Sequence, residues 1–425
     1  MLKTGETITL DVERPVAGGR MLARHGGQIV LVSGAIPGER VAARVERVAR
    51  SVAHADTVDV LVPSPDRRTA DDWRCGGREY AHIAYERQRA LKADVIGDAF
   101  RRIGRLPLPT PPPVMPSPET GYRMRARFHV ANGRLGFFRE GSHALCDADA
   151  TGQLSDGAVA WLVSAQQALT PRLAGALLGV ELAESVSGDQ RVVHLEVRDT
   201  VDPAELAALG EGLTGLSAHG SASPAAVVAG SPFVTDRLLT DAGGTPALVL
   251  SRHVRSFSQS NRFLLEPFVR HVVSRLRAGP VADLYAGVGL FGLAAAALGH
   301  GPVTLVEGDP TSGADLESNA GAFGAQVRVL RRSVEAALGG RLGPVATCLV
   351  DPPRTGLSDA ARAGVVRLAA PRVVYVSCDV ATLARDSRAL VDAGYALTDL
   401  TAVDLFPATA HIESVAVFDR VSEAG

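Results

Sequence analysis

The stretch Asp283–Gly292, which reads DLYAGVGLFG, follows a short apolar run and opens a helical pattern. Its glycines at positions 287, 289 and 292 satisfy the spacing G-x-G-x-x-G, in which small residues allow a tight turn and bring backbone N–H groups against a ligand. Glu307 lies about 20 residues after Gly287, at the end of the next apolar run, where a carboxylate can accept hydrogen bonds from ribose hydroxyls. The pair predicts a ligand that carries an adenosine and leaves NAD and S-adenosylmethionine as alternatives.

Short apolar runs rich in β-forming residues recur on both sides of this loop, with helical segments between them. Such alternation predicts a parallel, doubly wound sheet. The last two runs, 395–403 and 414–418, are joined without a connection of helix length, so the final strand is expected to return antiparallel. That ending is typical of Rossmann-like methyltransferase sheets rather than of dinucleotide dehydrogenases. The five parallel strands are predicted at Val281–Tyr285, Val303–Glu307, Val327–Leu330, Thr347–Val350 and Val373–Val376.

Polar residues follow two of these predicted strands. Asp351-Pro352-Pro353-Arg354 comes after the fourth strand, and Ser377-Cys378-Asp379 comes after the fifth. The carboxyl ends of parallel strands meet at the ligand-binding edge of such a sheet, so Cys378 is expected beside Asp351 and behind the glycine loop, as a nucleophile would be. Cys348 lies inside an apolar run and is expected to be a buried structural residue.

A candidate base precedes the final strand, in the loop Phe406–Glu413. Glu413 enters an apolar strand, where desolvation can hold a proton on a carboxyl group near neutral pH. His411, two residues earlier, is expected to be a structural hydrogen-bonding residue.

The rest of the chain predicts two further parts. Residues 1–62 contain short alternating runs separated by glycine pairs, the pattern of a small β-barrel. Residues 63–245 include a charged helical stretch at 80–103, a proline-dense stretch at 107–118 and a mixed α+β pattern with a helix near 158–178. Residues 246–425 form the α/β part.

Composition excludes several classes of protein. With 46% hydrophobic and 21% charged residues, the chain is neither disordered nor fibrous. Its apolar runs are too short to span a bilayer, and the N-terminus lacks a signal-peptide pattern, so we expect a cytoplasmic protein without a membrane partner. The net charge of -2 predicts no general affinity for polyanions, so any contact with nucleic acid must come from a local patch. The four cysteines show no C-x-x-C pair, and free thiols are expected.

Four segments together resemble the RNA 5-methyluridine methyltransferase family. They are Asp283–Gly289, Asp351–Arg354, Ser377–Asp386, which reads SCDVATLARD, and Phe406–Glu413. The barrel at residues 1–62 is similar to the TRAM domain, an RNA-binding barrel often found at the N-terminus of this family. The segment 256–261 resembles its F-x-Q-x-N motif, so the resemblance covers nearly the whole chain.

The resemblance implies a site and a reaction. Gln259, Tyr285, Glu307 and Asp351 would contact S-adenosylmethionine together with the loop at Gly287, Cys378 would be the nucleophile and Glu413 the base. C5 of uracil is a poor nucleophile, and a thiolate that adds to C6 raises the electron density at C5 until it can accept a methyl group. A carboxylate then removes the C5 proton, and elimination of the thiolate restores the ring.

Two departures from the family pattern affect these expectations. Many members hold an iron–sulfur cluster through a C-x5-C-G-G-C segment and a later cysteine. Here Thr69 and Arg78 occupy two of those positions, so no cluster and no other metal is expected, and Cys75 and Cys146 are expected to be free and close together. Ser333 stands where the family has an aspartate near the adenine, which leaves the adenine contacts open.

The RNA contact is expected on a predicted strand at 122–130, where Arg123, Arg125 and Arg127 alternate and so share one face. With Tyr122 and Phe128 they would form a surface that binds phosphates and stacks on a looped uridine in tRNA or rRNA. No obligate protein partner is evident, and a monomer is expected. Three alternatives remain: an amino-methyltransferase with the same Asp-Pro-Pro loop, an NAD-dependent oxidoreductase, and a catalytically silent RNA-binding protein.

Overall fold

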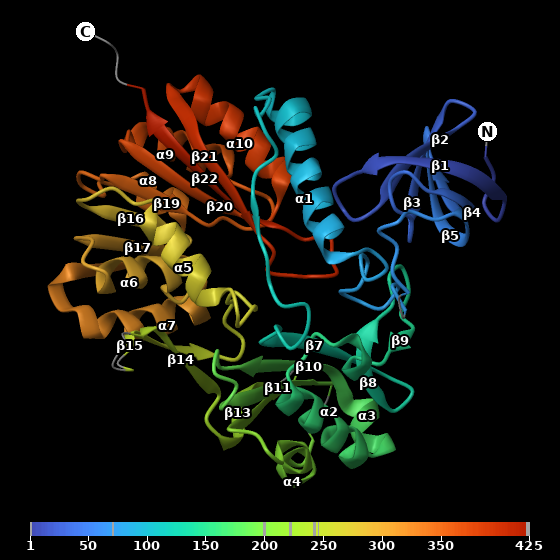
Figure 1. The fold of residues 1–425 in the computed structure, drawn as a ribbon. Helices are drawn as coiled ribbons and strands as arrows, with labels where there is room; N and C mark the ends of the chain where they lie inside the picture. Colours follow the sequence, from blue (N-terminus) through green and yellow to red (C-terminus); the bar gives the residue numbers. More distant parts are fainter. Residues whose placement is uncertain are drawn as a thin grey trace.

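The structure is a computed structural model that describes residues 2–69, 72–198, 201–220, 223–240, 244 and 246–421. Three sheet-containing parts follow one another along the chain (Figure 1): an N-terminal barrel, a central sheet and a large C-terminal sheet. This α/β architecture confirms the predicted fold class.

The N-terminal barrel is closed and has the strand order β1-β2-β3-β5-β4. Alternation builds it: in β1, Ile8, Leu10 and Val12 are buried while the residues between them are exposed. A barrel of this size is filled by such inward side chains and leaves no free sheet edge. The strands are β1 (Thr7–Pro15), β2 (Met21–His25), β3 (Gln28–Ser33), β4 (Arg40–Ala49) and β5 (Val52–Val62).

A connecting segment leads from the barrel to the central sheet by way of the C-terminal sheet. Helix α1 (Tyr85–Ala99) continues into the π-helical turn η1 (Phe100–Gly104), close to the helix predicted over 80–103. The proline-dense stretch that follows forms only the two-residue strand β6 (Val114–Met115), which pairs with the edge of the C-terminal sheet. Prolines lack the N–H that a central strand would need, so this edge position is what they permit.

The central part is a seven-stranded sheet with helices packed on it. The order is β13-β12-β11-β10-β7-β8-β9. The single helix predicted near 158–178 is wrong, because Pro171 starts a second helix whose N-terminus is capped by the Thr170 hydroxyl. The strands are β7 (Arg125–Ala131), β8 (Arg134–Phe138), β9 (Leu145–Cys146), β10 (Leu177–Glu184), β11 (Arg191–Val197), β12 (Gly215–Gly220) and β13 (Ser223–Gly230), and the helices are α2 (Asp156–Ala168), α3 (Pro171–Ala176) and α4 (Pro203–Ala207).

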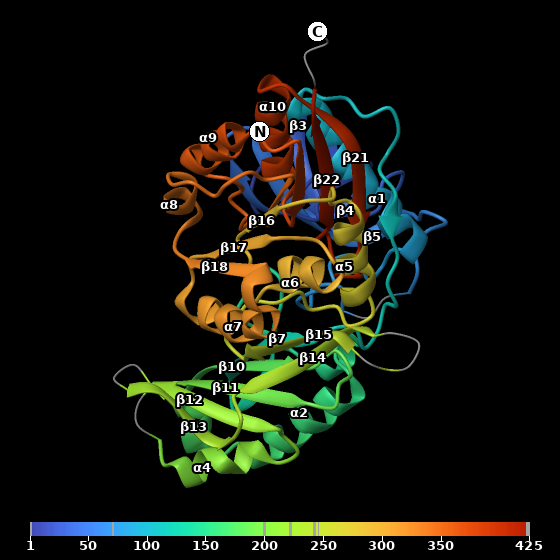
Figure 2. The ribbon, with the colours of Figure 1, turned by 90° about the vertical axis from the view of Figure 1, so that its left-hand side faces the viewer.

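A hairpin of β14 (Phe233–Thr240) and β15 (Pro246–His253) lies between the central sheet and the C-terminal part (Figure 2). On one side its leucines join the core beneath α5 and α6. On the other side the Arg252 guanidinium is buried, donates from Nε to Asp236 at 2.7 Å and also bonds the carbonyl of Glu184. The hairpin thus joins the two sheets.

The C-terminal sheet has the order β18-β17-β16-β19-β20-β22-β21-β6, parallel from β18 to β20. As predicted, the last strand is antiparallel, and it inserts between β20 and β21. The elements are α5 (Leu265–Ser274), β16 (Val281–Leu284), α6 (Leu290–Ala297), β17 (Val303–Glu307), α7 (Pro310–Ala320), β18 (Val327–Arg331), α8 (Val334–Leu338), β19 (Thr347–Val350), α9 (Asp359–Leu368), β20 (Arg372–Ser377), α10 (Val380–Asp392), β21 (Tyr395–Val403) and β22 (Glu413–Arg420).

Both faces of this sheet are covered, as its continuous apolar strands require. Helices α5, α6 and α7 contribute to one core cluster, and α8, α9 and α10 contribute to the other. The second cluster also contains Ala93, Ile96 and Ala99 of α1. A helix that precedes the central sheet in sequence therefore packs against the C-terminal sheet.

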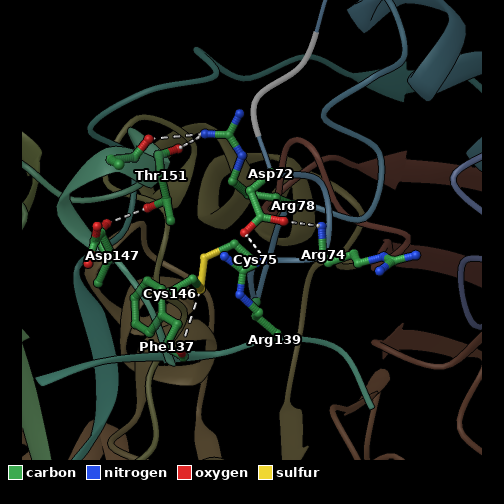
Figure 3. The surroundings of a disulfide bond; sticks show 12 residues. Asp72, Arg74, Cys75, Arg78, Phe137, Arg139, Cys146, Asp147 and Thr151 are labelled. Atoms are coloured by element: carbon green, nitrogen blue, oxygen red, sulfur yellow. Dashed lines mark hydrogen bonds and ion pairs between the residues drawn. A yellow bond between two sulfur atoms is a disulfide. The ribbon is translucent and has the colours of Figure 1, made fainter. Parts of the chain in front are cut away.

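The expectation that Cys75 and Cys146 are free is wrong, because the two form a disulfide bond (Figure 3). The expected proximity is confirmed, and its cause is local pairing. Cys146 pairs with Phe137 in the β8–β9 hairpin, and Cys75 forms a bridge with Arg139 at the end of β8. Their Cα atoms are 5.7 Å apart, within the range that a disulfide spans. Cys348 is buried and Cys378 half-buried, both as free thiols.

No helix within the described ranges is long and apolar enough to cross a membrane.

The disulfide predicts a thiol count that changes with reduction. Protein unfolded without reductant should show two reactive thiols, from Cys348 and Cys378, and four after reduction. Cys75→Ser should lower the free energy of unfolding by up to about 4 kcal/mol, because the bridge spans 71 residues. Titration with a chromogenic disulfide reagent and denaturant unfolding measure the two effects, with Cys348→Ser as the matched control. Four thiols before reduction would contradict the bridge.

Candidate active site

The glycine loop after β16 forms the turn that its spacing predicts. Gly289 has φ +98°, and a side chain there would meet Leu293 at 2.5 Å and Leu316 at 2.8 Å. Gly292 packs so closely on β17 that a Cβ would lie 2.2 Å from Leu305. Gly287, with φ +57°, differs because the space beside its Cα is open. Two glycines therefore serve packing, and Gly287 leaves backbone accessible to a ligand.

Glu307 lies at the end of β17 and its side chain turns back to the glycine loop. Its Oε2 accepts a hydrogen bond from Gly287 N at 2.7 Å, and its Oε1 accepts one from Asp309 N at 2.6 Å. Each carboxylate oxygen keeps a second acceptor site, which is where a ribose hydroxyl would bind. Tyr285, half-buried with φ +65°, lies in the same turn, and such backbone strain at a strand end is common at ligand sites.

Cys378 and Glu413 are brought together by the insertion of β22. Ser377, the last residue of β20, pairs with Ser414, so the antiparallel register puts Cys378 and Glu413 next to each other in the following pair. Asp351 approaches from the end of β19, the strand that neighbours β20 on its other side. The sequence predicted that Cys378 and Asp351 meet at this edge, and the strand order places both there. It did not predict that Glu413 joins them, because that depends on the pairing of β22 with β20.

The carboxyl groups at this edge are held away from water. Glu413 is 3% exposed, and its Oε1 has no hydrogen-bond partner among the described residues. Burial raises the pKa of Glu413 well above its usual range, the Asp351 charge adds to the shift, and Arg354 opposes it. Burial also raises the pKa of Asp351, to about 7. Burial raises the pKa of Asp283 as well, and the charge of Asp351 adds to this shift.

The Cys378 thiol faces a cleft and is protonated at rest. Burial, followed by the charges of Glu413 and Asp351, raises the pKa of Cys378 to about 11, and Arg354 acts in the opposite direction. The next residue, Asp379, caps helix α10 by accepting from Ala381 N and Thr382 N, which fixes the backbone at the thiol.

The cleft in front of Cys378 has a volume of about 250 Å³ and is lined by all three parts of the chain. The barrel contributes Ala17 and Gly18, the connecting and central segments contribute Glu79 and Glu140, and the C-terminal part contributes Arg354 and His411. Burial lowers the pKa of His411 to about 4, with Arg354 contributing, so this imidazole is neutral. Its ring lies edge-on to Phe406, and the structural hydrogen-bonding role expected of it stays a prediction.

The segment 256–261 lies beside this site. Gln259 is buried, and its contact with S-adenosylmethionine stays a prediction. The motif's asparagine, Asn261, has a structural role: its Nδ2 donates to Ser117 Oγ at 2.8 Å and to the carbonyl of Leu405 at 3.0 Å. Asn261 therefore connects this segment to the loop that leads into Glu413.

The arginines predicted to contact RNA, in and just before β7, already form ion pairs or hydrogen bonds within the protein. Arg125 and Arg127 both pair with Glu181 of β10, and Arg127 also pairs with Glu196 of β11. Arg123 donates to Gln153 and lies over the ring of Phe137. These guanidiniums already have intramolecular partners, so an RNA contact there would be shared with carboxylates.

The stacking role expected of Tyr122 and Phe128 is wrong, because both rings are fully buried. In a strand, successive side chains point to opposite faces, so the aromatic residues that alternate with the arginines pack into the core. Phe128 stacks on Phe137 there.

Sequence reasoning missed Glu79, Glu140, Lys92 and Asp404. The first two line the cleft, and the last two form a buried ion pair between α1 and the loop that leads into Glu413. One signal for Lys92 was available, since it is one of only two lysines among 44 basic residues.

Comparison with known proteins agrees with this geometry. Residues 2–58 match the TRAM domain, and residues 326–421 match the family described as tRNA (Uracil-5-)-methyltransferase. The chain is 31% identical over 420 residues to the 23S rRNA (uracil(1939)-C(5))-methyltransferase RlmD of Aeromonas hydrophila, covering 94% of this chain and 93% of the relative. It is 32% identical to an uncharacterized RNA methyltransferase of Streptomyces avermitilis, covering 99% of each.

A solved structure shares the fold. The crystal structure of Pyrococcus abyssi tRNA (uracil-54, C5)-methyltransferase in complex with S-adenosyl-L-homocysteine superposes with a TM-score of 0.78 at 22% identity, covering 96% of this chain and 99% of that one. The identity to the full-length relatives, the two matched segments and the shared fold lead to one assignment: the chain belongs to the RNA (uracil-C5)-methyltransferase family and carries a TRAM domain at its N-terminus.

Proposed function

We propose that this enzyme methylates C5 of a uridine in RNA through a covalent bond between Cys378 Sγ and C6 of the base. The observation that carries the proposal is the pairing of β20 with β22, which puts a thiol and a buried carboxyl group side by side at a cleft. This reaction needs both a nucleophile that adds to C6 and a base that removes the C5 proton.

The residues around the glycine loop fit S-adenosylmethionine. Gly287 leaves open space beside the backbone, Glu307 keeps acceptor sites for a ribose, and Tyr285 offers a half-buried ring. Gln259 and Asp351 would complete this set from neighbouring segments. Bound there, S-adenosylmethionine would supply an electrophilic methyl group for C5.

Cys378 has to lose its proton before it can add to C6. Arg354 is the cation that favours the thiolate, and the neighbouring carboxylates oppose it. Addition forms the Sγ–C6 bond and moves the C5–C6 π electrons toward C5 and O4, so that C5 becomes the nucleophilic carbon.

Glu413 completes the reaction as the base. After methylation, C5 carries both a methyl group and a proton, and the ring cannot regain its double bond until that proton leaves. An unprotonated Glu413 carboxylate removes it, the C5–H electrons re-form C5=C6, and the Sγ–C6 bond breaks to release thiolate. Burial makes this carboxylate a stronger base than one in water, since its raised pKa means tighter proton binding.

The substrate proposal follows the relatives. The relative named for uracil 1939 of 23S rRNA is 31% identical, and the one named for uracil 54 of tRNA is 22% identical. We therefore propose 23S rRNA as the substrate to test first, with tRNA second. We also propose a cytoplasmic monomer, since the RNA proposed as substrate is cytoplasmic and residues from all three parts of the chain line the cleft.

Covalent catalysis predicts a trapped complex with RNA that contains 5-fluorouridine. Fluorine at C5 cannot leave as a proton does, so purified enzyme, S-adenosylmethionine and this RNA should give a methylated protein–RNA band on a denaturing gel. Cys378→Ala should abolish the band, and Cys348→Ala should retain it as the matched control. RNA binding without a band would favour a catalytically silent binder, and methylation that survives Cys378→Ala would favour an amino-methyltransferase.

The raised pKa values predict a rate that increases with pH. Cys378 and Glu413 both act in their deprotonated forms and both have raised pKa values. Initial rates of methylation, a step that requires only the Cys378 thiolate, should increase from about pH 6 to about pH 9, by at most roughly tenfold per unit. Arg354→Met removes the charge that lowers both values and should shift the profile to higher pH. Arg367→Met, on the exposed side of α9, should leave it in place. A rate that decreases over this range would refute the assignment.

A further inference from the structure

The loop between β21 and β22, residues 404–412, leads directly into Glu413 and is held from outside its own sheet. Lys92 of α1 donates from Nζ to Asp404 Oδ1 at 2.5 Å and to the carbonyl of Phe406 at 3.1 Å. The side chains of Lys92 and Asp404 are 1% and 0% exposed. Because 312 residues separate the pair along the chain, this contact is purely tertiary.

A second set of contacts holds the middle of the same loop. Ala408 has φ +62°, a left-handed conformation that a residue with a Cβ rarely adopts. Its N–H donates to Gln88 Oε1 at 2.8 Å, and its carbonyl accepts from Tyr80 N at 2.7 Å. Gln88 is itself fixed, because its Nε2 donates to the carbonyls of Tyr80 and Ile83. The unusual backbone is thus held at both polar groups.

A buried ion pair contributes little net stability to the loop that it holds. Removing both charges from water carries a desolvation penalty that their attraction does not reliably offset, so such a pair is better explained by geometry than by stability. The choice of cation supports this view. The chain uses arginine nearly everywhere, yet here it has a compact ammonium group that can bond a carboxylate and a carbonyl in a confined space.

We propose that Lys92, assisted by Gln88, is a positioning residue that sets the place of the Glu413 carboxylate, an inference that rests on the proposed role of Glu413 as the base. Cys378 is positioned differently, by β20 and the N-terminus of α10. Loosening the loop should therefore impair the second half of the reaction and spare the first. Addition to C6 and methylation should proceed, and removal of the C5 proton should become slow.

The test uses full-length Lys92→Met with RNA that contains natural uridine and with labelled S-adenosylmethionine. Time points quenched in denaturant should show a methylated protein–RNA adduct that accumulates and decays at least about tenfold more slowly than in the wild type. Trapping by 5-fluorouridine RNA should stay within about twofold of the wild type, because that reaction ends before proton removal. Lys92→Arg should restore part of the decay rate.

Arg252→Met is the matched control, because Arg252 and Asp236 form another buried pair, with 1% and 5% exposed side chains, outside the 404–412 loop. It should lower stability without accumulation of the adduct. If Lys92→Met does not fold, Gln88→Met provides the same test without leaving a buried charge unpaired.

Two failures are distinguishable. If wild-type enzyme forms no adduct with 5-fluorouridine RNA, the proposed covalent function is wrong. If the wild type forms it, and Lys92→Met loses trapping and turnover together as a merely destabilised protein would, the positioning role is overturned.

Discussion

Strand β22 runs antiparallel between β20 and β21, and this pairing decides where chemistry can take place. In an all-parallel sheet the next residue after a strand end lies at the start of a loop, far from the start of any other strand. Reversal of one strand brings a strand start to a strand end, and Glu413 comes to lie beside Cys378 at the edge where Asp351 also lies. The surrounding sheet buries Glu413 and partly buries Cys378 and Asp351.

That burial has opposite effects on the two reactive groups. It makes Glu413 a stronger base by raising its pKa, and it makes Cys378 harder to ionise for the same reason. The positive charge of Arg354 opposes this effect, because it lowers the pKa of both Glu413 and Cys378. The site therefore depends on one cation at the mouth of a cleft whose other walls carry Glu79 and Glu140. An acidic cleft of this kind suits an uncharged uracil ring that is flipped into it while the charged phosphates stay outside the cleft.

Features of the fold and of the site could be predicted from sequence where they depend on residues close together along the chain, and could not where they depend on distant residues. The parallel strands were predictable because each apolar run is local. Cys378 could be proposed as the nucleophile because the segment around it is distinctive. The partners of Arg125 and Arg127 were not, since Glu181 and Glu196 come from strands that pair with β7 only after folding. The predicted boundaries near residues 62 and 245 stay predictions.

The disulfide and the Lys92–Asp404 pair were missed for the same reason. Their partners are 71 and 312 residues apart, and neither cysteine nor lysine has a periodicity that would reveal its partner. Cys75 and Cys146 match two of the positions that bind the cluster in the family, which correctly suggested that they lie close together. This match could not indicate the bond between them, because that depends on the register of the β8–β9 hairpin with the segment at Cys75.

The loop before Glu413 is held by hydrogen bonds from two regions: the segment proposed to contact S-adenosylmethionine, and helix α1. Asn261, next to the residues assigned to S-adenosylmethionine, holds the carbonyl of Leu405. Gln88 and Lys92 hold Ala408 and Phe406 from α1, and the segment that leads into α1 contributes Tyr80 and Ile83 to the core of the barrel. Asn261 thus connects the proposed base to the segment proposed to contact the methyl donor, and Gln88 and Lys92 connect it to the segment that packs on the N-terminal barrel. Because the loop has no regular structure of its own, these hydrogen bonds from several segments tie the position of Glu413 to the packing of distant parts of the chain.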